Sequence, residues 1–340
     1  MQATRPLARR NLLLCFDAFD TLYKPNVAVP AAYAFAAQRA GIDCVADGTS
    51  AKPVEQWSAK DYEPVYKSFK QAYKRQSAEN PNYGKATGLG AEKWWANVIR
   101  ATFLPFLKPQ QEVPDALISE LLQRYSSSEG YDLFPDAKAF FNILREARSQ
   151  ASSGSPWKWD RTVVGVISNS DDRVPSILSS LGLNVKPRRI GSSIQHIAEA
   201  EDISFVVHSY DVGYEKPDSR IFNAATDILA ASSASIGPID DYKRLYVGDS
   251  LSHDYIGAEK AGWHSVLIDR NGSEKEWRAE VERKTPLQTK WVGGEDGERK
   301  KIVVVNGLDE LVNWHPKNKW TGERPGRKAR KDRSRSGEEP

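Results

Sequence analysis

The chain has 340 residues, of which 40% are hydrophobic, 27% charged and 10% aromatic. This composition is ordinary for a globular protein of about two domains, and its aromatic content excludes wholesale disorder. The 48 Lys and Arg residues nearly balance the 45 Asp and Glu residues, so the chain as a whole does not resemble a nucleic-acid-binding protein. No run of 18 apolar residues occurs, which excludes a membrane-spanning helix.

The first predicted element is a strand at Asn11–Phe16, because a short continuous apolar run is typical of a buried parallel strand. A helix is predicted at residues 29–40. Apolar residues spaced by three and four then predict further helices near residues 62–73, 94–99 and 117–122, with a polar loop at 80–90. The aromatic residues Trp57, Trp94 and Trp95 are expected to pack in this helical block rather than to line a pocket.

From residue 134 onward, short apolar strands alternate with helices. Strands are predicted at 162–167, 203–208, 244–247, 264–268 and 301–305, and helices at 136–148, 174–181, 217–231, 254–261 and 308–314. Alternation of this kind predicts a parallel sheet with helices on both faces. The predicted fold class is therefore α/β, a Rossmann-like doubly wound parallel sheet with an inserted helical domain. We place the sheet domain at 11–24 and 132–314, and the helical domain at 25–131.

Positive charge is concentrated at the C-terminal end. Residues 316–340 carry nine Lys or Arg and four Asp or Glu, so this segment has a charge of +5 and the rest of the chain −2. We expect 315–340 to be a basic disordered tail. Its run at 327–331 resembles a nuclear-localisation or nucleic-acid patch, and a solvated disordered tail is the slightly favoured reading of the same charges. Nucleic-acid contact is expected only as weak, non-specific binding by this tail.

The expected location is cytoplasmic, with the nucleus as an alternative through the basic tail. The two cysteines, Cys15 and Cys44, give no disulfide framework, which favours a reducing compartment. The first ten residues carry three Arg and no acid, a weak similarity to a mitochondrial presequence. Mitochondrial import is the less favoured reading, because the strand at Asn11 leaves almost no spacer for cleavage.

Polar residues follow several of the predicted strands, at the sheet edge where ligands bind in open parallel sheets. They are Asp17, Ser168, Asn169 and Asp249, together with Lys216 at the start of a helix. Each alone is weak evidence, because Asp and Ser often cap helices and Lys is usually a surface charge. Together they bring carboxylates, a lysine and a hydroxyl to one edge.

These residue types suit hydrolysis of a phosphate or similar ester. Asp17 is a candidate nucleophile, since a carboxylate can attack phosphorus or carbon and form a covalent intermediate. Asp249 and Asp254 are five positions apart on a predicted strand-to-helix turn, where both could reach one Mg²⁺, a cation that prefers oxygen ligands. Lys216 would supply a fixed positive charge, and Ser168 a hydrogen bond to a phosphoryl oxygen.

Four segments carry a resemblance to a known family. They are LLLCFDAFDTLY, VVGVISNSDD, GYEKPDSRIF and YVGDSLSHDYIGAEKAGW, and they frame residues 11–314. In order and spacing they resemble the motifs of the haloacid dehalogenase (HAD) superfamily of hydrolases. The resemblance implies a HAD-type core, and it implies that the helical block at 25–131 is a C1-type cap. The chain is most similar to the eukaryotic HAD-like hydrolase domain-containing branch, which includes the rhythmically-expressed-gene type proteins.

The resemblance also implies roles for the matching residues. Asp17 would be the nucleophile, Ser168 would bind the phosphoryl group, and Lys216 would steady the charge on Asp17. Asn169 and Thr21 would contact the substrate, a small phosphorylated metabolite. The implied cofactor is Mg²⁺, and its ligands would be Asp17, the backbone carbonyl of Phe19, Asp249 and Asp254, the last directly or through water.

Phe19 departs from the phosphatase pattern. Family phosphatases usually carry a second Asp there as general acid and base, and a missing general acid typically costs about 10²–10⁴-fold in rate. The next residue, Asp20, would point to the opposite side of an extended segment. The family's dehalogenases carry an aromatic residue at the Phe19 position, but dehalogenation needs no metal, whereas Asp249 with Asp254 is the metal-binding version of the fourth motif.

Three functions therefore remain open. The favoured one is a Mg²⁺-dependent phosphohydrolase acting through an aspartyl-phosphate on Asp17, with turnover weakened by Phe19. The alternatives are a metal-free dehalogenase-like hydrolase and a non-catalytic binding protein with the HAD fold. Metal dependence separates the first two, and the effect of Asp17→Asn separates both from the third.

Overall fold

The structure is a computed structural model that describes residues 11–53, 56–149, 155–186, 201–232, 236–270, 287–293 and 299–316. The predictions for the first ten residues, and those for the tail beyond residue 316, lie outside the described residues. Within the described part of the chain, no helix is both long enough and apolar enough to cross a membrane.

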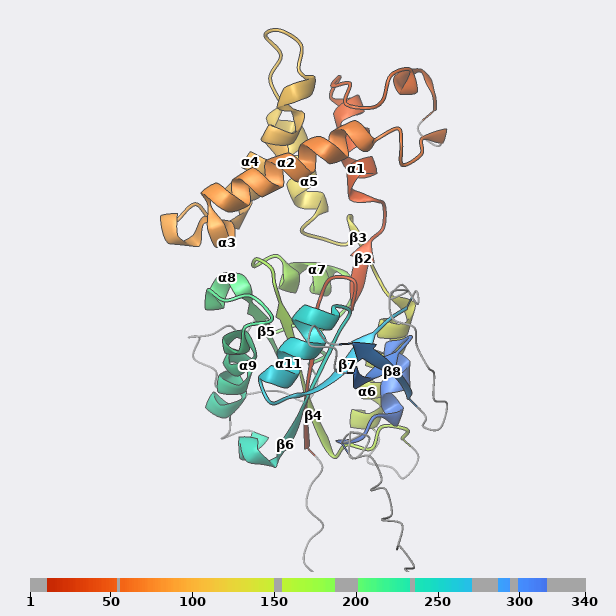
Figure 1. The fold of residues 1–340 in the computed structure, drawn as a ribbon, viewed down its shortest axis with the longest axis vertical. Coiled ribbons are helices and arrows are strands. Elements are labelled where there is room, and N and C mark those ends of the chain that lie inside the picture. The colour runs from red at the N-terminus through yellow and green to blue at the C-terminus, as the bar shows by residue number, and fades with distance from the viewer. Residues whose placement is uncertain are drawn as a thin grey trace, which may run out of the picture.

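A seven-stranded, mostly parallel sheet forms the centre of the molecule (Figure 1). Its strands, in spatial order, are β5 (Phe205–His208), β4 (Arg161–Ser168), β1 (Asn11–Phe16), β6 (Tyr242–Gly248), β7 (His264–Ile268), β9 (Arg299–Val305) and β8 (Gln288–Gly293). The first strand of the chain, β1, lies between β4 and β6 and pairs with both in parallel. The carboxyl ends of these three strands consequently meet at one edge.

Successive residues of β1 face opposite sides of the sheet, and each side is covered by helices. Leu12, Leu14 and Phe16 join the core under α6 (Pro135–Ser149), α7 (Val174–Ser180) and the 3₁₀ helix η7 (Leu308–Asn313). Leu13 and Cys15 join a second core under α9 (Ser219–Ala231) and α11 (Gly257–Lys260). This alternation confirms the predicted Rossmann-like, doubly wound architecture.

Helices α1 to α5, called the cap below, lie over the carboxyl edge of the sheet (Figure 1). They are α1 (Val29–Arg39), α2 (Glu63–Glu79), α3 (Pro81–Gly84), α4 (Ala91–Phe103) and α5 (Asp115–Arg124), with short 3₁₀ helices η1 (Thr49–Ala51), η3 (Lys85–Thr87) and η4 (Leu104–Phe106). The chain enters and leaves the cap through an antiparallel pair, β2 (Tyr23–Pro25) and β3 (Tyr131–Leu133). This pair spans both limits proposed for the helical domain, and those limits stay predictions.

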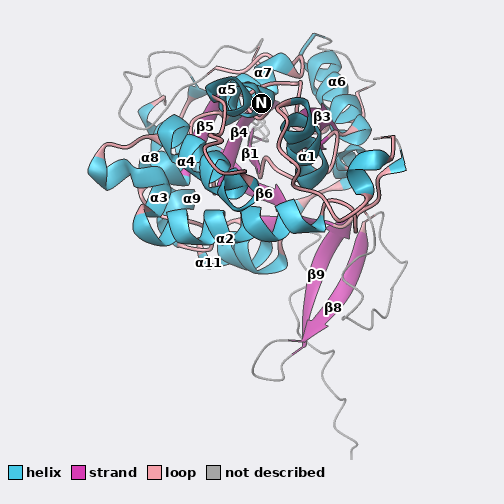
Figure 2. Ribbon diagram, turned by 90° about the horizontal axis from the view of Figure 1, so that it is seen from above, coloured by secondary structure: helices cyan, strands magenta, loops and turns pink. Residues whose placement is uncertain are grey.

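Four local predictions differ from the structure. The sheet is not wholly parallel, because the edge strand β8, which lacks an apolar run, pairs antiparallel with β9, and Figure 2 shows this pair extending away from the helices. The segment 80–90, predicted as a loop, contains α3 and η3. The predicted helix at 254–261 is a π-helical turn, η6 (Leu251–Ile256), followed by α11, and the predicted helix at 308–314 is the 3₁₀ helix η7. The remaining short helices are α8 (Ser209–Val212) and the 3₁₀ helix η5 (Ile239–Asp241).

Candidate active site

Asp17 is the first residue after β1, at the carboxyl edge of the sheet. Its backbone N–H donates to Val247 O of β6 at 2.9 Å, which continues the strand pairing by one residue. The chain then turns back tightly, since Leu22 N–H donates to Ala18 O at 2.8 Å and Asp20 has a φ of 56°. This turn holds Asp17 at the carboxyl edge of the sheet, where the residue is 8% exposed.

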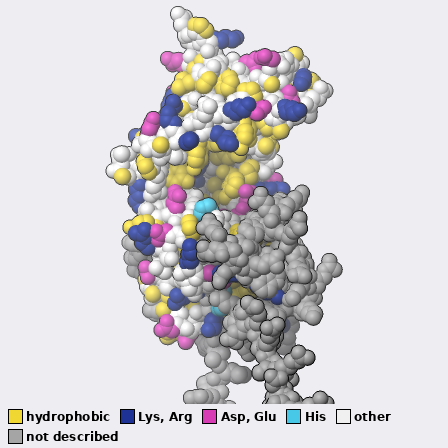
Figure 3. Space-filling view, viewed as in Figure 1, with side chains coloured by type: hydrophobic (Ala, Val, Ile, Leu, Met, Phe, Trp, Pro, Cys, Tyr) yellow, Lys and Arg dark blue, Asp and Glu magenta, His cyan; other side chains and the backbone are white. Residues whose placement is uncertain are grey.

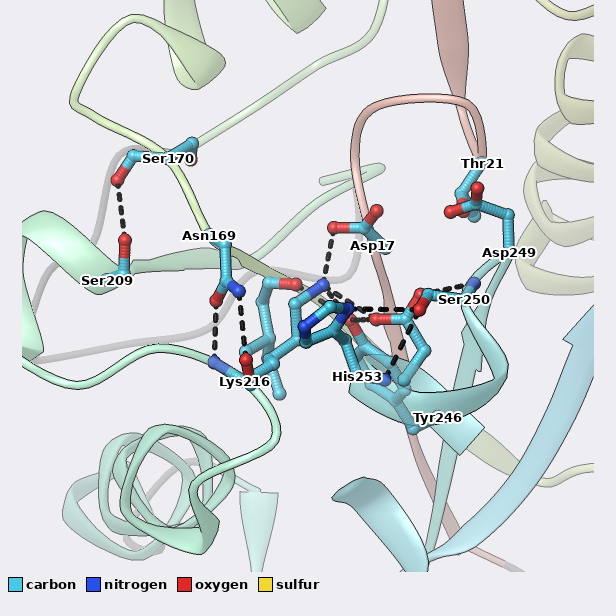
Figure 4. Close-up of polar contacts among 12 residues, drawn as sticks. Asp17, Thr21, Asn169, Ser170, Ser209, Lys216, Tyr246, Asp249, Ser250 and His253 are labelled. Atoms are coloured by element: carbon cyan, nitrogen blue, oxygen red, sulfur yellow. Dashed lines mark hydrogen bonds and ion pairs between the residues drawn. The ribbon is translucent and has the colours of Figure 1, made fainter. Parts of the chain in front are cut away.

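Lys216 is the centre of the polar contacts, and Figure 4 shows its side chain pointing toward Asp17. The Lys216 Nζ donates to Asp17 Oδ1 at 2.7 Å, to Asp254 Oδ1 at 2.7 Å and to the Tyr246 hydroxyl at 2.9 Å. Burial acts to lower the pKa of Lys216, but Asp17 and Asp254 outweigh it and raise that pKa. The lysine is thus held as a buried cation between two carboxylates.

Asn169 fixes the backbone of Lys216. Its Oδ1 accepts from Lys216 N–H at 2.6 Å, and its Nδ2 donates to Lys216 O at 3.1 Å (Figure 4). The amide group therefore orients the lysine, and the predicted contact of Asn169 with substrate stays a prediction. Ser168, the last residue of β4, is 4% exposed and lines the pocket described below.

Three carboxylates converge at this edge. Oxygens of Asp17, Asp249 and Asp254 lie within 4.8 Å of one another. Asp254 Oδ2 also accepts from Ser250 N–H at 2.9 Å, and Asp249 Oδ1 lies 3.5 Å from the Thr21 hydroxyl. Close approach here depends on Gly248, because a Cβ on that residue would lie 2.3 Å from the carboxyl carbon of Asp254.

The electrostatics of the carboxylates reflect burial and crowding. Burial raises the pKa of Asp17, Lys216 offsets part of that increase, and repulsion from Asp254 adds to it. Burial, with repulsion from Asp254 and Asp20, raises the pKa of Asp249 to about 6.

Three carboxylates facing one lysine carry two negative charges in excess, and a divalent cation that prefers oxygen ligands fits this donor set. The residues that would hold Mg²⁺ are Asp17, Asp249 and Asp254, and a contribution from the Phe19 carbonyl stays a prediction.

Phe19 and Asp20 face different surroundings. The Phe19 side chain is 43% exposed, and its ring meets those of Tyr23 and Tyr131 edge-on at centroid distances of 6.2 and 6.4 Å. The backbone carbonyls of Asp20 and Thr21 accept from Arg270 at 2.9 and 2.7 Å. Phe19 lines the pocket below, whereas Asp20 is absent from its lining in the described part of the chain.

A pocket of about 260 Å³ extends from Ser168 and Asn169 into the cap. Figure 3 shows hydrophobic side chains around the hollow between the cap and the sheet domain. Trp95 lines this pocket, so the expectation that it only packs is wrong. Trp94 is 2% exposed within a small cap core, and Trp57 packs against the main core, as expected.

Two charged residues of the pocket were not found from the sequence. Asp171 and Arg173 follow β4, and Arg173 Nε and Nη2 donate to the two oxygens of Asp171 at 2.8 Å each. Trp95 Nε1 donates to the same carboxylate at 2.7 Å, and the Arg173 guanidinium lies 4.7 Å from the Trp95 ring centroid. Tyr246 was also missed, and the available signal was its place as the first residue of the fourth motif segment, YVGDSLSHDYIGAEKAGW.

Comparisons with known proteins agree with the motifs. A family model described as haloacid dehalogenase-like hydrolase matches residues 12–262. Haloacid dehalogenase-like hydrolase domain-containing protein 3 of Mus musculus is 30% identical over 256 residues, which cover 75% of this chain and 81% of the mouse protein. The Rhythmically expressed gene 2 protein of Drosophila melanogaster is 25% identical over 214 residues, or 61% of this chain and 70% of the fly protein.

Two solved structures resemble the fold at low sequence identity. A 2-haloacid dehalogenase from Pseudomonas syringae has a TM-score of 0.46 and 18% identity, and the match covers 88% of this chain and 96% of that one. A HAD phosphatase from Thermococcus onnurineus has a TM-score of 0.40 and 18% identity, with 77% and 88% covered.

Proposed function

The chain belongs to the haloacid dehalogenase-like hydrolases, and from this premise we propose that it is a Mg²⁺-dependent phosphohydrolase of a small phosphorylated metabolite. The observation that carries the proposal is Lys216, whose ammonium contacts both Asp17 and Asp254 at 2.7 Å beside a third carboxylate, Asp249. A nucleophilic carboxylate, a fixed cation and an excess of negative charge next to a pocket suit transfer of a phosphoryl group to Asp17.

In the proposed reaction, an Asp17 oxygen attacks phosphorus, and the ester oxygen leaves with the electron pair of the broken bond. Lys216 stabilises the ionised carboxylate before attack and the negative charge that develops on the phosphoryl oxygens. Mg²⁺, when bound, would supply further positive charge against the carboxylates and the phosphoryl group. Water then attacks phosphorus of the aspartyl-phosphate, which releases phosphate and restores Asp17.

Phosphate release tests this proposal directly. Wild type and Asp17→Asn are compared on a panel of phosphorylated metabolites and an activated aryl phosphate, with Mg²⁺ or with EDTA. We expect release that requires Mg²⁺ and falls by about a thousandfold or more in Asp17→Asn, as for loss of a nucleophile. Asp240→Asn is the matched control, because Asp240 is exposed in η5, which precedes β6, whereas Asp249 follows the other end of that strand. Equal release from wild type and Asp17→Asn would refute the proposal.

A metal-free dehalogenase-like hydrolase is the second candidate, and Phe19 beside an aromatic pocket favours it. Water carrying heavy oxygen separates the two reactions. In the phosphohydrolase, water attacks phosphorus and the label enters phosphate. In a dehalogenase-like reaction, water attacks the carboxyl carbon of an ester intermediate and the label enters Asp17. The excess negative charge of the three carboxylates favours the first outcome.

A further inference from the structure

We infer that the substrates of this enzyme are phosphate monoesters of small, uncharged aromatic hydroxyl compounds. The inference rests on the proposed phosphohydrolase function and narrows its substrate class. Two independent features of the pocket carry it. One is the aromatic lining without an unpaired charge. The other is that the described lining residues hold no carboxylic acid or imidazole that can protonate the leaving oxygen.

The walls are aromatic. Eight of the lining residues are Phe, Tyr or Trp, and they come from the cap, from β2 and β3, and from Phe19. Among them, Tyr33 meets Phe69, and Tyr23 meets Tyr131, with ring centroids 5.2 and 5.0 Å apart. Aromatic side chains favour offset or edge-on contact with another flat ring. The volume of about 260 Å³ is below the range of about 300–1,000 Å³ usual for ligand pockets, which favours a small group.

The walls also offer no unpaired charge. Asp171 and Arg173 are the charged residues among the described lining residues. They neutralise each other through two hydrogen bonds of 2.8 Å, and Trp95 occupies a further acceptor position of Asp171 at 2.7 Å. A substrate with a second anionic group, such as phosphoglycolate, would find no free cation here, and a cationic group no free carboxylate. Burying such a charge without a partner is unfavourable.

The described lining residues provide no carboxylic acid or imidazole that can protonate the leaving group at neutral pH, and burial raises the pKa values of their tyrosines. They include no His, and Asp171 is their one carboxyl group. Burial acts to raise the pKa of Asp171, but the Arg173 guanidinium outweighs it and the pKa is lowered. Asp171 therefore stays ionised at neutral pH and has no proton to donate. No carboxyl group or imidazole of the described lining therefore protonates the ester oxygen as it leaves.

An unprotonated departure favours a phenolic oxygen over an alkyl one. A phenol has a pKa of about 10, whereas an alkyl alcohol is nearer to water, at about 15.7. In the reaction, the bond from phosphorus to the aryl oxygen breaks, its electron pair stays on the phenolate, and the phenolate takes a proton from water. A second water attacks the aspartyl-phosphate, and its proton neutralises the hydroxide left by the first. Both the leaving group and the walls thus favour an aryl ester.

Three esters that differ in leaving group, aromaticity and charge test the inference. Phenyl phosphate is aromatic with a good leaving group, benzyl phosphate is aromatic with a poor one, and phosphoglycolate is small and charged. With Mg²⁺, we expect kcat/KM for phenyl phosphate to exceed that for benzyl phosphate about tenfold or more, and benzyl phosphate to exceed phosphoglycolate about tenfold. Faster turnover of phosphoglycolate than of phenyl phosphate would overturn the inference and leave the proposed function standing. No release from any ester would count against the proposed function itself.

A matched pair of variants on α2 tests the aromatic wall. Phe69 lines the pocket, whereas Tyr66 is 42% exposed and does not. Phe69→Ala should raise KM for phenyl phosphate about tenfold and change KM for phosphoglycolate less than twofold, while Tyr66→Ala changes neither. A folding defect would lower the activity on both esters alike, so the selective effect identifies the wall. Equal effects of Phe69→Ala on both esters would contradict the inference.

Freeing Arg173 should reverse the selectivity. Asp171→Asn removes the negative charge opposite Arg173 and leaves a cation in the pocket. We expect the ratio of kcat/KM for phosphoglycolate to that for phenyl phosphate to rise about tenfold in this variant.

Binding to the wild type gives a second measurement that does not require turnover. Phenylphosphonate should bind the wild type more tightly than methylphosphonate does in calorimetry. An unchanged ratio, or equal binding of the two phosphonates, would contradict the assignment of the walls.

Discussion

Lys216 connects groups that are far apart in the sequence. Its ammonium contacts Asp17, Asp254 and Tyr246, and its backbone is held by Asn169. Asp17, Asp249 and Lys216 were predicted from their places after strands or before a helix. Tyr246 was not predicted, because a buried tyrosine in a strand ordinarily packs, and its contact with Lys216 depends on how α9 approaches the sheet.

Tyr246→Phe tests the positioning of Lys216. The variant removes a hydroxyl that accepts from Lys216 Nζ and donates to Ile167 O at 2.8 Å. The control is Tyr242→Phe on the same strand, where the hydroxyl donates to Ile236 O at 3.0 Å away from the site. Both should lower the free energy of unfolding by about 1 kcal/mol. Only Tyr246→Phe should lower kcat, by roughly tenfold, with KM nearly constant, and a similar kcat in both variants would contradict the positioning role.

Phe19→Asp tests the expectation that Phe19 weakens turnover. The side chain is 43% exposed at the pocket, so a carboxyl group there can reach the leaving oxygen without burying a new charge. We expect hydrolysis of benzyl phosphate, which needs protonation, to rise about a hundredfold, within the range for general acid catalysis. Phenyl phosphate should gain much less. Asp20→Asn should leave both rates within twofold, and a large loss in that variant would instead identify Asp20 as the acid.

At the scale of elements, the turn after β1 is held by the end of β7 and the start of α6. Arg270 donates to the carbonyls of Asp20 and Thr21, and it forms a two-point ion pair with Asp136 of α6 at 3.2 and 2.7 Å. Asp136 also accepts from Leu308 N–H at 2.8 Å. The turn that follows Asp17 is consequently coupled to the helix that follows the cap.

Arg270→Lys should loosen this turn. Lysine cannot form the paired hydrogen bonds of a guanidinium, so the variant should lose about 1–2 kcal/mol of stability. It should also lose about tenfold to a hundredfold in kcat/KM through misplacement of Asp17. Arg145→Lys is the control, since Arg145 forms a similar pair with Asp202, at 2.8 and 2.6 Å, away from the site. Equal losses of activity in the two variants would argue against the coupling.

The sequence predicted those elements whose pattern is local. The apolar runs of β1, β4 and β6 predicted strands, because each strand ends in at least four consecutive buried residues. The edge strand β8 was missed because QTKWVG has no apolar run and is defined by its pairing with β9. The pair of β2 and β3 was also missed. Each strand has only three residues, and the whole cap separates the two strands in the sequence, so no local pattern indicates their pairing. The neutral aromatic pocket depends on how the cap meets the sheet domain, which no local pattern encodes.

At the scale of the whole molecule, the cap and the sheet domain share a buried cluster of tyrosines. Burial raises the pKa of Tyr131 to about 12, and it raises the pKa values of Tyr23, Tyr33 and Tyr125 as well. Burial also raises the pKa of the Cys44 thiol to about 12. These groups keep their protons in the folded protein at pH values where the unfolded chain loses them.

Stability should therefore fall at alkaline pH. The unfolded thiols titrate near pH 8.5 and the unfolded tyrosines near pH 10, so the contribution is complete below these values and is lost as the pH rises toward 12. Urea unfolding at pH 8 and pH 11 should show a lower free energy of unfolding at pH 11. Tyr131→Phe should make that decrease smaller. A free energy of unfolding that stays constant between the two pH values would contradict the burial of this cluster.

The central claim is that Asp17 carries the phosphoryl group during turnover. The most direct measurement mixes the protein and Mg²⁺ with an aryl phosphate whose phosphorus is radioactive, stops the reaction with acid within the first turnover, and maps the label by peptide analysis. We predict label on the peptide that contains Asp17, none in Asp17→Asn, and loss of the label when unlabelled substrate is added before the acid. If the wild type releases labelled phosphate but no label appears on the Asp17 peptide at any time during turnover, the account is contradicted.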